Sequence, residues 1–96
     1  MTPLELLRQK REDILRVAAK HGAYNVRVFG SVARGEARLD SDIDLLIERG
    51  PMTSSWFPAG LVLDLEEILG RRVEVVTERA LNPHLRDRVL REAVSL

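Results

Sequence analysis

The stretch VFGSVARGEARLDSDIDLLIE, residues 28–48, organises the rest of the chain. An apolar strand is predicted over residues 26–29, and a sharp turn follows at Gly30 and Ser31. A run of small and charged residues then leads to a second predicted strand over residues 41–48. The stretch therefore predicts two strands joined by a glycine turn and a short helix.

Two carboxylates lie on one face of the second predicted strand. Because side chains alternate along a strand, Asp42 and Asp44 should share a face. The opposite face carries the apolar residues Ile43, Leu45 and Ile47, which should turn toward a core. Carboxylates with Cα atoms roughly 6.5–7 Å apart can share hard cations, and paired metal ions are typical of nucleotidyl transfer. An ordinary solvated strand face is the alternative, and the pair alone does not decide.

The turn at Gly30 and Ser31 supplies a second chemical feature. Glycine allows the backbone to approach a ligand closely, and Ser31 adds a hydroxyl group. A helix beginning at Ser31 would point free amide groups at a phosphate. Carboxylates beside such a turn are typical of a site for a nucleoside triphosphate and magnesium. The sequence contains no GxxxxGK[ST] motif, so the site is not a Walker P-loop.

The two motifs together resemble a known signature. GSVARG at residues 30–35, followed by SDIDL at residues 41–45, is similar to the signature of the DNA polymerase beta-like nucleotidyltransferase superfamily. On so short a chain, the pattern most resembles the minimal nucleotidyltransferases. These are prokaryotic proteins often encoded beside a HEPN-domain partner, as antitoxin to toxin. The resemblance extends over nearly the whole chain.

The resemblance implies roles for particular residues. Asp42 and Asp44 would be catalytic and would hold two Mg²⁺ ions, and the Gly30–Ser31 turn would hold the terminal phosphates of ATP. The family places a third carboxylate on a later strand, usually as aspartate. Glu74, within a predicted strand at residues 73–77, matches that position and departs in type. Its extra methylene could displace the general base and metal ligand by about an ångström, a scale to which catalysis is sensitive.

Two further residues near the motif are candidates for nucleotide binding. Arg34 lies one turn beyond Ser31 and could contact a phosphate or simply be a surface arginine. Ser41 could hydrogen-bond the carboxylate site or simply begin the second strand. The residue pattern leaves both questions open.

The activity implied by the resemblance is Mg²⁺-dependent transfer of AMP from ATP to a tyrosine hydroxyl of a HEPN-domain toxin. We expect an oligomer, formed either with that toxin or between copies of this chain. One alternative is an antitoxin that neutralises its toxin by binding alone, which the glutamate at position 74 somewhat favours. Another is a small-molecule transferase of the antibiotic-modifying type, although the acceptor domain usual in such enzymes has no counterpart here.

Composition limits the remaining possibilities. Ninety-six residues, 45% hydrophobic and 31% charged, predict one globular domain over residues 1–96. Fifteen basic and fifteen acidic residues cancel, so no strong field favours direct nucleic-acid binding. The sequence has no cysteine for a disulfide or thiolate site, and no apolar run approaches membrane-spanning length. We expect a cytoplasmic location and no membrane contact.

The remaining segments predict an α/β (α+β) domain, a small mixed sheet with helices packed on one face, as in the polymerase beta-like palm fold. Helices are predicted over residues 2–20, from residue 55 or 58 to residue 70, and from residue 82 onward. Leu85 and Val89 should belong to an apolar stripe of the last helix. Trp56 and Phe57 should cap the core, with stacking on a base or contact with a partner as the alternatives. The open face of the sheet would then carry the three acids.

Overall fold

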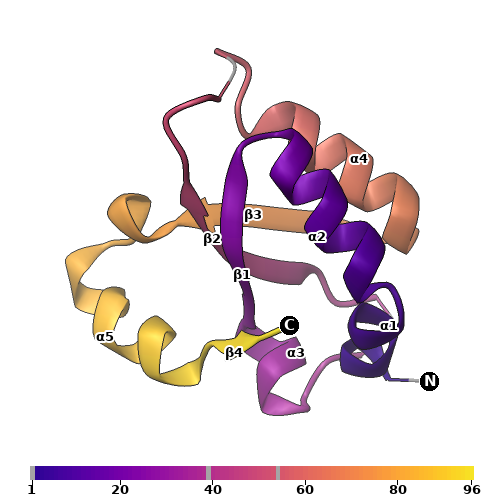
Figure 1. The fold of residues 1–96 in the computed structure, drawn as a ribbon. Coiled ribbons are helices and arrows are strands. Elements are labelled where there is room, and N and C mark those ends of the chain that lie inside the picture. The colour runs from indigo at the N-terminus through magenta and orange to yellow at the C-terminus, as the bar shows by residue number, and fades with distance from the viewer. Residues whose placement is uncertain (1, 39, 54) are drawn as a thin grey trace.

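The structure is a computed structural model that describes residues 2–38, 40–53 and 55–96. These residues form a four-stranded sheet in the order β3-β2-β1-β4 (Figure 1). The strands are β1 (Ala23–Phe29), β2 (Ile43–Arg49), β3 (Val73–Thr77) and β4 (Val94–Ser95). β1 runs antiparallel to β2 and β4, whereas β2 and β3 are parallel. The predicted mixed sheet is therefore confirmed.

The helices follow most of the predicted boundaries. They are α1 (Pro3–Gln9), α2 (Arg11–Lys20), α3 (Gly30–Arg34), α4 (Ala59–Leu69) and α5 (Pro83–Glu92), with a 3₁₀ turn η1 (Glu78–Ala80). Thr2 caps α1 by accepting a hydrogen bond from the Glu5 amide, and Asn82 caps α5 in the same way. The single helix predicted over residues 2–20 is wrong, because the backbone at Lys10 (φ −94°, ψ 10°) separates α1 from α2.

The hydrophobic core lies between the sheet and one group of helices. The alternation predicted for β2 is confirmed, because Ile43, Leu45 and Ile47 are all buried. They pack with buried residues of α1, α2 and α4, namely Leu7, Ile14, Ala18, Leu61, Leu65 and Leu69. The opposite face of β2 carries Asp44, as the alternation requires.

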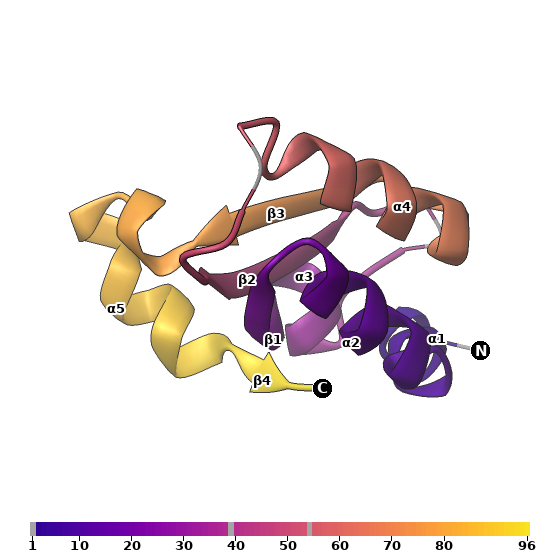
Figure 2. The same cartoon turned by 45° about the horizontal axis from the view of Figure 1, so that its top comes forward.

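Helix α5 lies apart from that group. Both views place it away from α2 and α4, with the strands between them (Figures 1 and 2). Val89 is buried, but Leu85 is 50% exposed, so the prediction that Leu85 belongs to a packed stripe is wrong. α5 packs mainly against α3 and leads into β4 beside β1, and within the described residues the Leu85 side chain of its apolar face stays half exposed.

The predicted start of β2 and the predicted packing of Trp56 also need correction. Ser41 and Asp42 lie before β2 rather than within it. Trp56 is 79% exposed and does not cap the core, whereas Phe57 packs against the core and under the Arg49 guanidinium, 5.0 Å from the ring centroid. Of the described helices, none combines the length and apolar character needed to cross a membrane.

Candidate active site

The sheet register brings the glycine turn and two of the predicted acids together. Phe29, at the end of β1, pairs with Asp44 on β2, and Asp44 pairs with Glu74 on β3. Paired residues on neighbouring strands project their side chains to the same face. Asp44 and Glu74 therefore lie side by side, next to the turn that follows Phe29.

Gly30 lies directly against the side chain of Asp44. Its φ of +73° lies in the left-handed region, which L side chains rarely adopt. A Cβ atom at this position would also overlap the Oδ2 atom of Asp44. The backbone conformation and the lack of space for a Cβ atom thus both favour glycine at this position. The lack of space shows that the backbone of the turn lies directly against the Asp44 carboxylate.

The Asp44 carboxyl carries an unbalanced charge. Burial, followed by the charge of Glu74, a hydrogen bond with Glu74 and the charge of Asp42, together raise its pKa from an ordinary 3.8 to about 6. The positive charge of Arg34 acts in the opposite direction. The site therefore holds more negative charge than its surroundings compensate, and a bound cation would relieve it.

This charge predicts a pH-dependent cost to stability. Because the folded-state pKa of Asp44 exceeds its unfolded value, the ionised carboxylate opposes folding above about pH 6, and the opposition fades as the pH falls toward 3.8. Asp44→Asn, melted without metal, should raise Tm at neutral pH by about 4–8 °C per kcal/mol of repulsion removed. The gain should vanish below the ordinary pKa. A lower Tm at neutral pH would mean that the carboxylate is structural.

The third predicted acid stands next to this pair rather than within it. Asp42 is exposed just before β2 and, together with Glu74, lines a shallow hollow of about 350 Å³ at the β3 edge. Among the residues that the structure describes, no three such side chains are gathered into a ready-made metal site. The donor type nevertheless suits a hard divalent cation, since Asp44 and Glu74 are adjacent and the charges of Glu74 and Asp42 both raise the pKa of Asp44.

The candidate phosphate-binding residues lie around the turn. Arg34, the last residue of α3, forms ion pairs with Glu36, at 3.0 Å, and with Glu92 at the end of α5. Ser31 is half-buried in α3. The Ser41 hydroxyl accepts a hydrogen bond from the Arg38 amide at 2.8 Å, and so closes the link that leads to Asp42.

Glu92 is a site residue that sequence reasoning missed. Its carboxylate contacts the Arg34 guanidinium and accepts a hydrogen bond from the Gly30 amide at 3.4 Å. The hydrogen bond from Arg34 lowers the pKa of Glu92. No local motif marks this residue, because its partners lie about sixty positions earlier in the chain.

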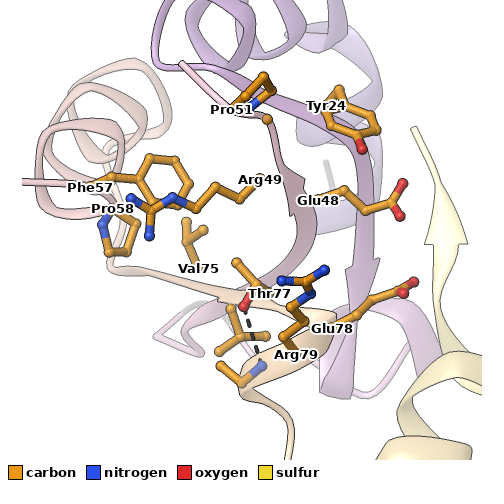
Figure 3. A pocket seen from close by; sticks show the side chains of 13 residues that line it. Tyr24, Glu48, Arg49, Pro51, Phe57, Pro58, Val75, Thr77, Glu78 and Arg79 are labelled. Carbon is orange, nitrogen blue, oxygen red and sulfur yellow. Dashed lines mark hydrogen bonds between the residues drawn. The ribbon is translucent and has the colours of Figure 1, made fainter. Parts of the chain in front are cut away.

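The larger cavity lies elsewhere. It measures about 820 Å³ and is bounded by the ends of β2 and β3 and by the loop that precedes α4. Figure 3 shows Arg49 extending toward Phe57 on one side of the cavity, with Tyr24 and Glu48 on the other. Asp44 lies near the opposite end of β2, so the cavity is separate from the acidic site.

The turn at Gly30 lies against Asp44 of β2, and Asp44 lies beside Glu74 of β3, as the resemblance to the nucleotidyltransferase superfamily implies. Residues 8–96 match the model of the nucleotidyltransferase domain family, and the chain belongs to that family. It is a nucleotidyltransferase of the minimal type, and the resemblance seen in the two sequence motifs is confirmed.

Similar proteins agree with this assignment. A Methanocaldococcus jannaschii protein, provisionally named a protein adenylyltransferase, is 41% identical over 90% of this chain and 92% of its own. Protein adenylyltransferase MntA of Thermococcus cleftensis is 39% identical over 78% and 76%, respectively.

Solved structures agree as well. A structure provisionally described as a minimal nucleotidyltransferase is 55% identical, with a TM-score of 0.86 over all of this chain and 97% of its own. A toxin–antitoxin complex with AMP-PNP, 20% identical, matches 88% of this chain and 69% of its own with a TM-score of 0.73, and it shares the fold.

Proposed function

We propose that this protein is a Mg²⁺-dependent adenylyltransferase that moves AMP from ATP to a tyrosine hydroxyl of a HEPN-domain toxin and so acts as its antitoxin. One observation carries the proposal: Gly30 is pressed against Asp44, which lies beside Glu74. The names of the two relatives favour protein adenylylation as the reaction. The toxin–antitoxin complex that shares the fold favours a toxin as partner.

The acids would hold the metal. Asp42, Asp44 and Glu74 would ligate Mg²⁺, which when bound neutralises charge on the triphosphate and activates the attacking oxygen. Because ligation needs an ionised Asp44, and the pKa of this carboxyl without metal is about 6, Mg²⁺ should bind less tightly as the pH drops below that value.

The chain's own residues then supply orientation and proton transfer. Gly30, Ser31 and Arg34 would bind the terminal phosphates, and Ser41 would support the loop that carries Asp42. The tyrosine oxygen attacks the α-phosphorus as the bond to the pyrophosphate oxygen breaks, and Glu74 accepts the phenolic proton. Arg34 also balances negative charge on the departing pyrophosphate.

Nucleotide binding tests the proposed site. The wild-type protein should bind AMP-PNP with Mg²⁺ in calorimetry, and the Asp42→Ala, Asp44→Ala double variant should lose that binding, because it removes two of the three metal carboxylates. A double variant with Ala at Asp13 and Asp64, acids outside the site, matches the charge change as a control. Equal affinity in the wild-type protein and the site variant would contradict the assignment.

A second function has specific support. Glutamate at position 74 departs from the usual aspartate, and the exposed Trp56 and Leu85 offer apolar surface for a protein partner. An antitoxin that acts by binding alone would use such a surface and would not need the acids. The two functions differ in one outcome, which is whether the partner gains mass.

A further inference from the structure

The carboxylate of Glu92 lies where the proposed function expects an anion. It contacts the guanidinium of Arg34 and the backbone amide of Gly30 together. These are two of the groups assigned above to the terminal phosphates of ATP. The Glu92 side chain is 15% exposed and the Arg34 side chain 36%, so the contact between α5 and the turn is partly exposed.

The chemistry of the two donors suits a phosphate at least as well as a carboxylate. A guanidinium and a backbone amide recognise oxyanions of both kinds through charge-assisted hydrogen bonds. A triphosphate brings several anionic oxygens to the position that Glu92 fills with one carboxylate. The Glu92 carboxylate and a phosphate cannot occupy this position at once, because both would need the same two donors and their negative charges would repel each other.

Glu36 provides a comparison within the same site. It also pairs with Arg34, at 3.0 Å, but its side chain is 65% exposed, and within the described part of the chain its carboxylate forms no hydrogen bond with Gly30. A phosphate at the turn can therefore leave Glu36 in place, whereas it must displace Glu92.

We propose that Glu92 is a built-in competitor for the phosphate position, so that a nucleoside triphosphate must displace it in order to place its terminal phosphates there. This inference rests on the function proposed above. ATP reaches Gly30 and Arg34 with its terminal phosphates and replaces the carboxylate. AMP has no terminal phosphates, so it gains nothing from displacing Glu92.

The displaced carboxylate has another partner available. Arg88 lies one turn earlier on α5 and is close enough for its charge to act on Glu92. Residues four apart on a helix face each other, so Glu92 can turn to Arg88 when a phosphate takes Arg34. Displacement also removes a contact that joins α5 to α3, which should loosen the end of the chain.

Calorimetry on two matched variants tests this proposal. Glu92→Gln should bind AMP-PNP with Mg²⁺ about tenfold more tightly than wild type, the scale of one charge-assisted contact at a partly exposed site, and should bind AMP unchanged. Glu36→Gln, with the same charge change beside the same arginine, should bind both ligands as wild type does. Hydrogen exchange gives an independent readout: AMP-PNP should speed exchange across residues 83–96 in wild type and have little effect there in Glu92→Gln.

Each contrary result has a definite meaning. If wild type binds AMP-PNP and Glu92→Gln binds it equally or more weakly, Glu92 only holds Arg34 in position and the competitor role is wrong. If Glu36→Gln raised the affinity for AMP-PNP as much as Glu92→Gln does, the gain would come from the loss of one negative charge near Arg34. That result would also overturn the competitor role of Glu92. If neither wild type nor Glu92→Gln binds AMP-PNP, with folding verified by circular dichroism, the proposed function fails together with this inference.

Discussion

Replacing Glu74 with glutamine should lower the rate of AMP transfer to the partner toxin by about 10²- to 10⁴-fold, the range typical of losing a general acid or base. Glutamine keeps the size and polarity of the side chain but can neither accept the phenolic proton nor hold a metal ion with a negative charge. Glu74 is exposed on β3 beside Asp44, so the substitution removes no core packing.

Two comparisons separate catalysis from docking. Glu74→Asp keeps the charge and restores the residue usual in the family, so it should retain transfer. A pull-down should show that Glu74→Gln still binds the toxin, because the exposed Trp56 and Leu85, proposed above as apolar surface for a partner, are unchanged. Transfer by Glu74→Gln at the wild-type rate would remove this residue from the mechanism.

Gly30→Ala should abolish nucleotide binding and lower Tm. The added Cβ atom would both strain a backbone at φ +73° and overlap the Asp44 carboxylate, so the turn and the acid cannot both keep their places. Left-handed strain alone costs about 1–2 kcal/mol, which corresponds to several degrees of Tm in a domain of this size. The overlap should add to that cost and should displace Asp44.

Gly35→Ala is the matched control. Gly35 ends α3 with nearly the same φ, +74°, but a Cβ atom there would meet nothing within 4 Å. It should therefore show the strain in Tm and retain affinity for AMP-PNP. Equal loss of affinity in both variants would mean that backbone strain, rather than the contact with Asp44, governs the site.

Much of the fold followed from local patterns in the sequence. Alternating residues correctly predicted β3 and its outward Glu74, and cap residues placed the starts of α1 and α5. Local patterns could not predict β4, since two residues carry no detectable alternation and this strand depends on pairing with β1. The break at Lys10 was also missed, because the residues around it are all compatible with helix.

The candidate site also combines features that local sequence predicts with features that depend on the tertiary fold. The turn and the Asp42–Asp44 pair are sequence motifs, but the meeting of Asp44 with Glu74 depends on the register of a parallel strand pair separated by α4. The contact of Glu92 with Gly30 and Arg34 depends on where α5 lies in space. Nothing local to Glu92 distinguishes it from the other charged residues of that helix.

Intact mass spectrometry of the toxin tests the central claim most directly. The purified HEPN-domain partner, incubated with this protein, ATP and Mg²⁺, should gain the mass of one or more AMP groups, carried on a tyrosine. The Asp42→Asn, Asp44→Asn double variant should bind the toxin and leave its mass unchanged. A toxin that is neutralised with no added mass, and equally well by the double variant, would contradict the account and establish an antitoxin that acts by binding alone.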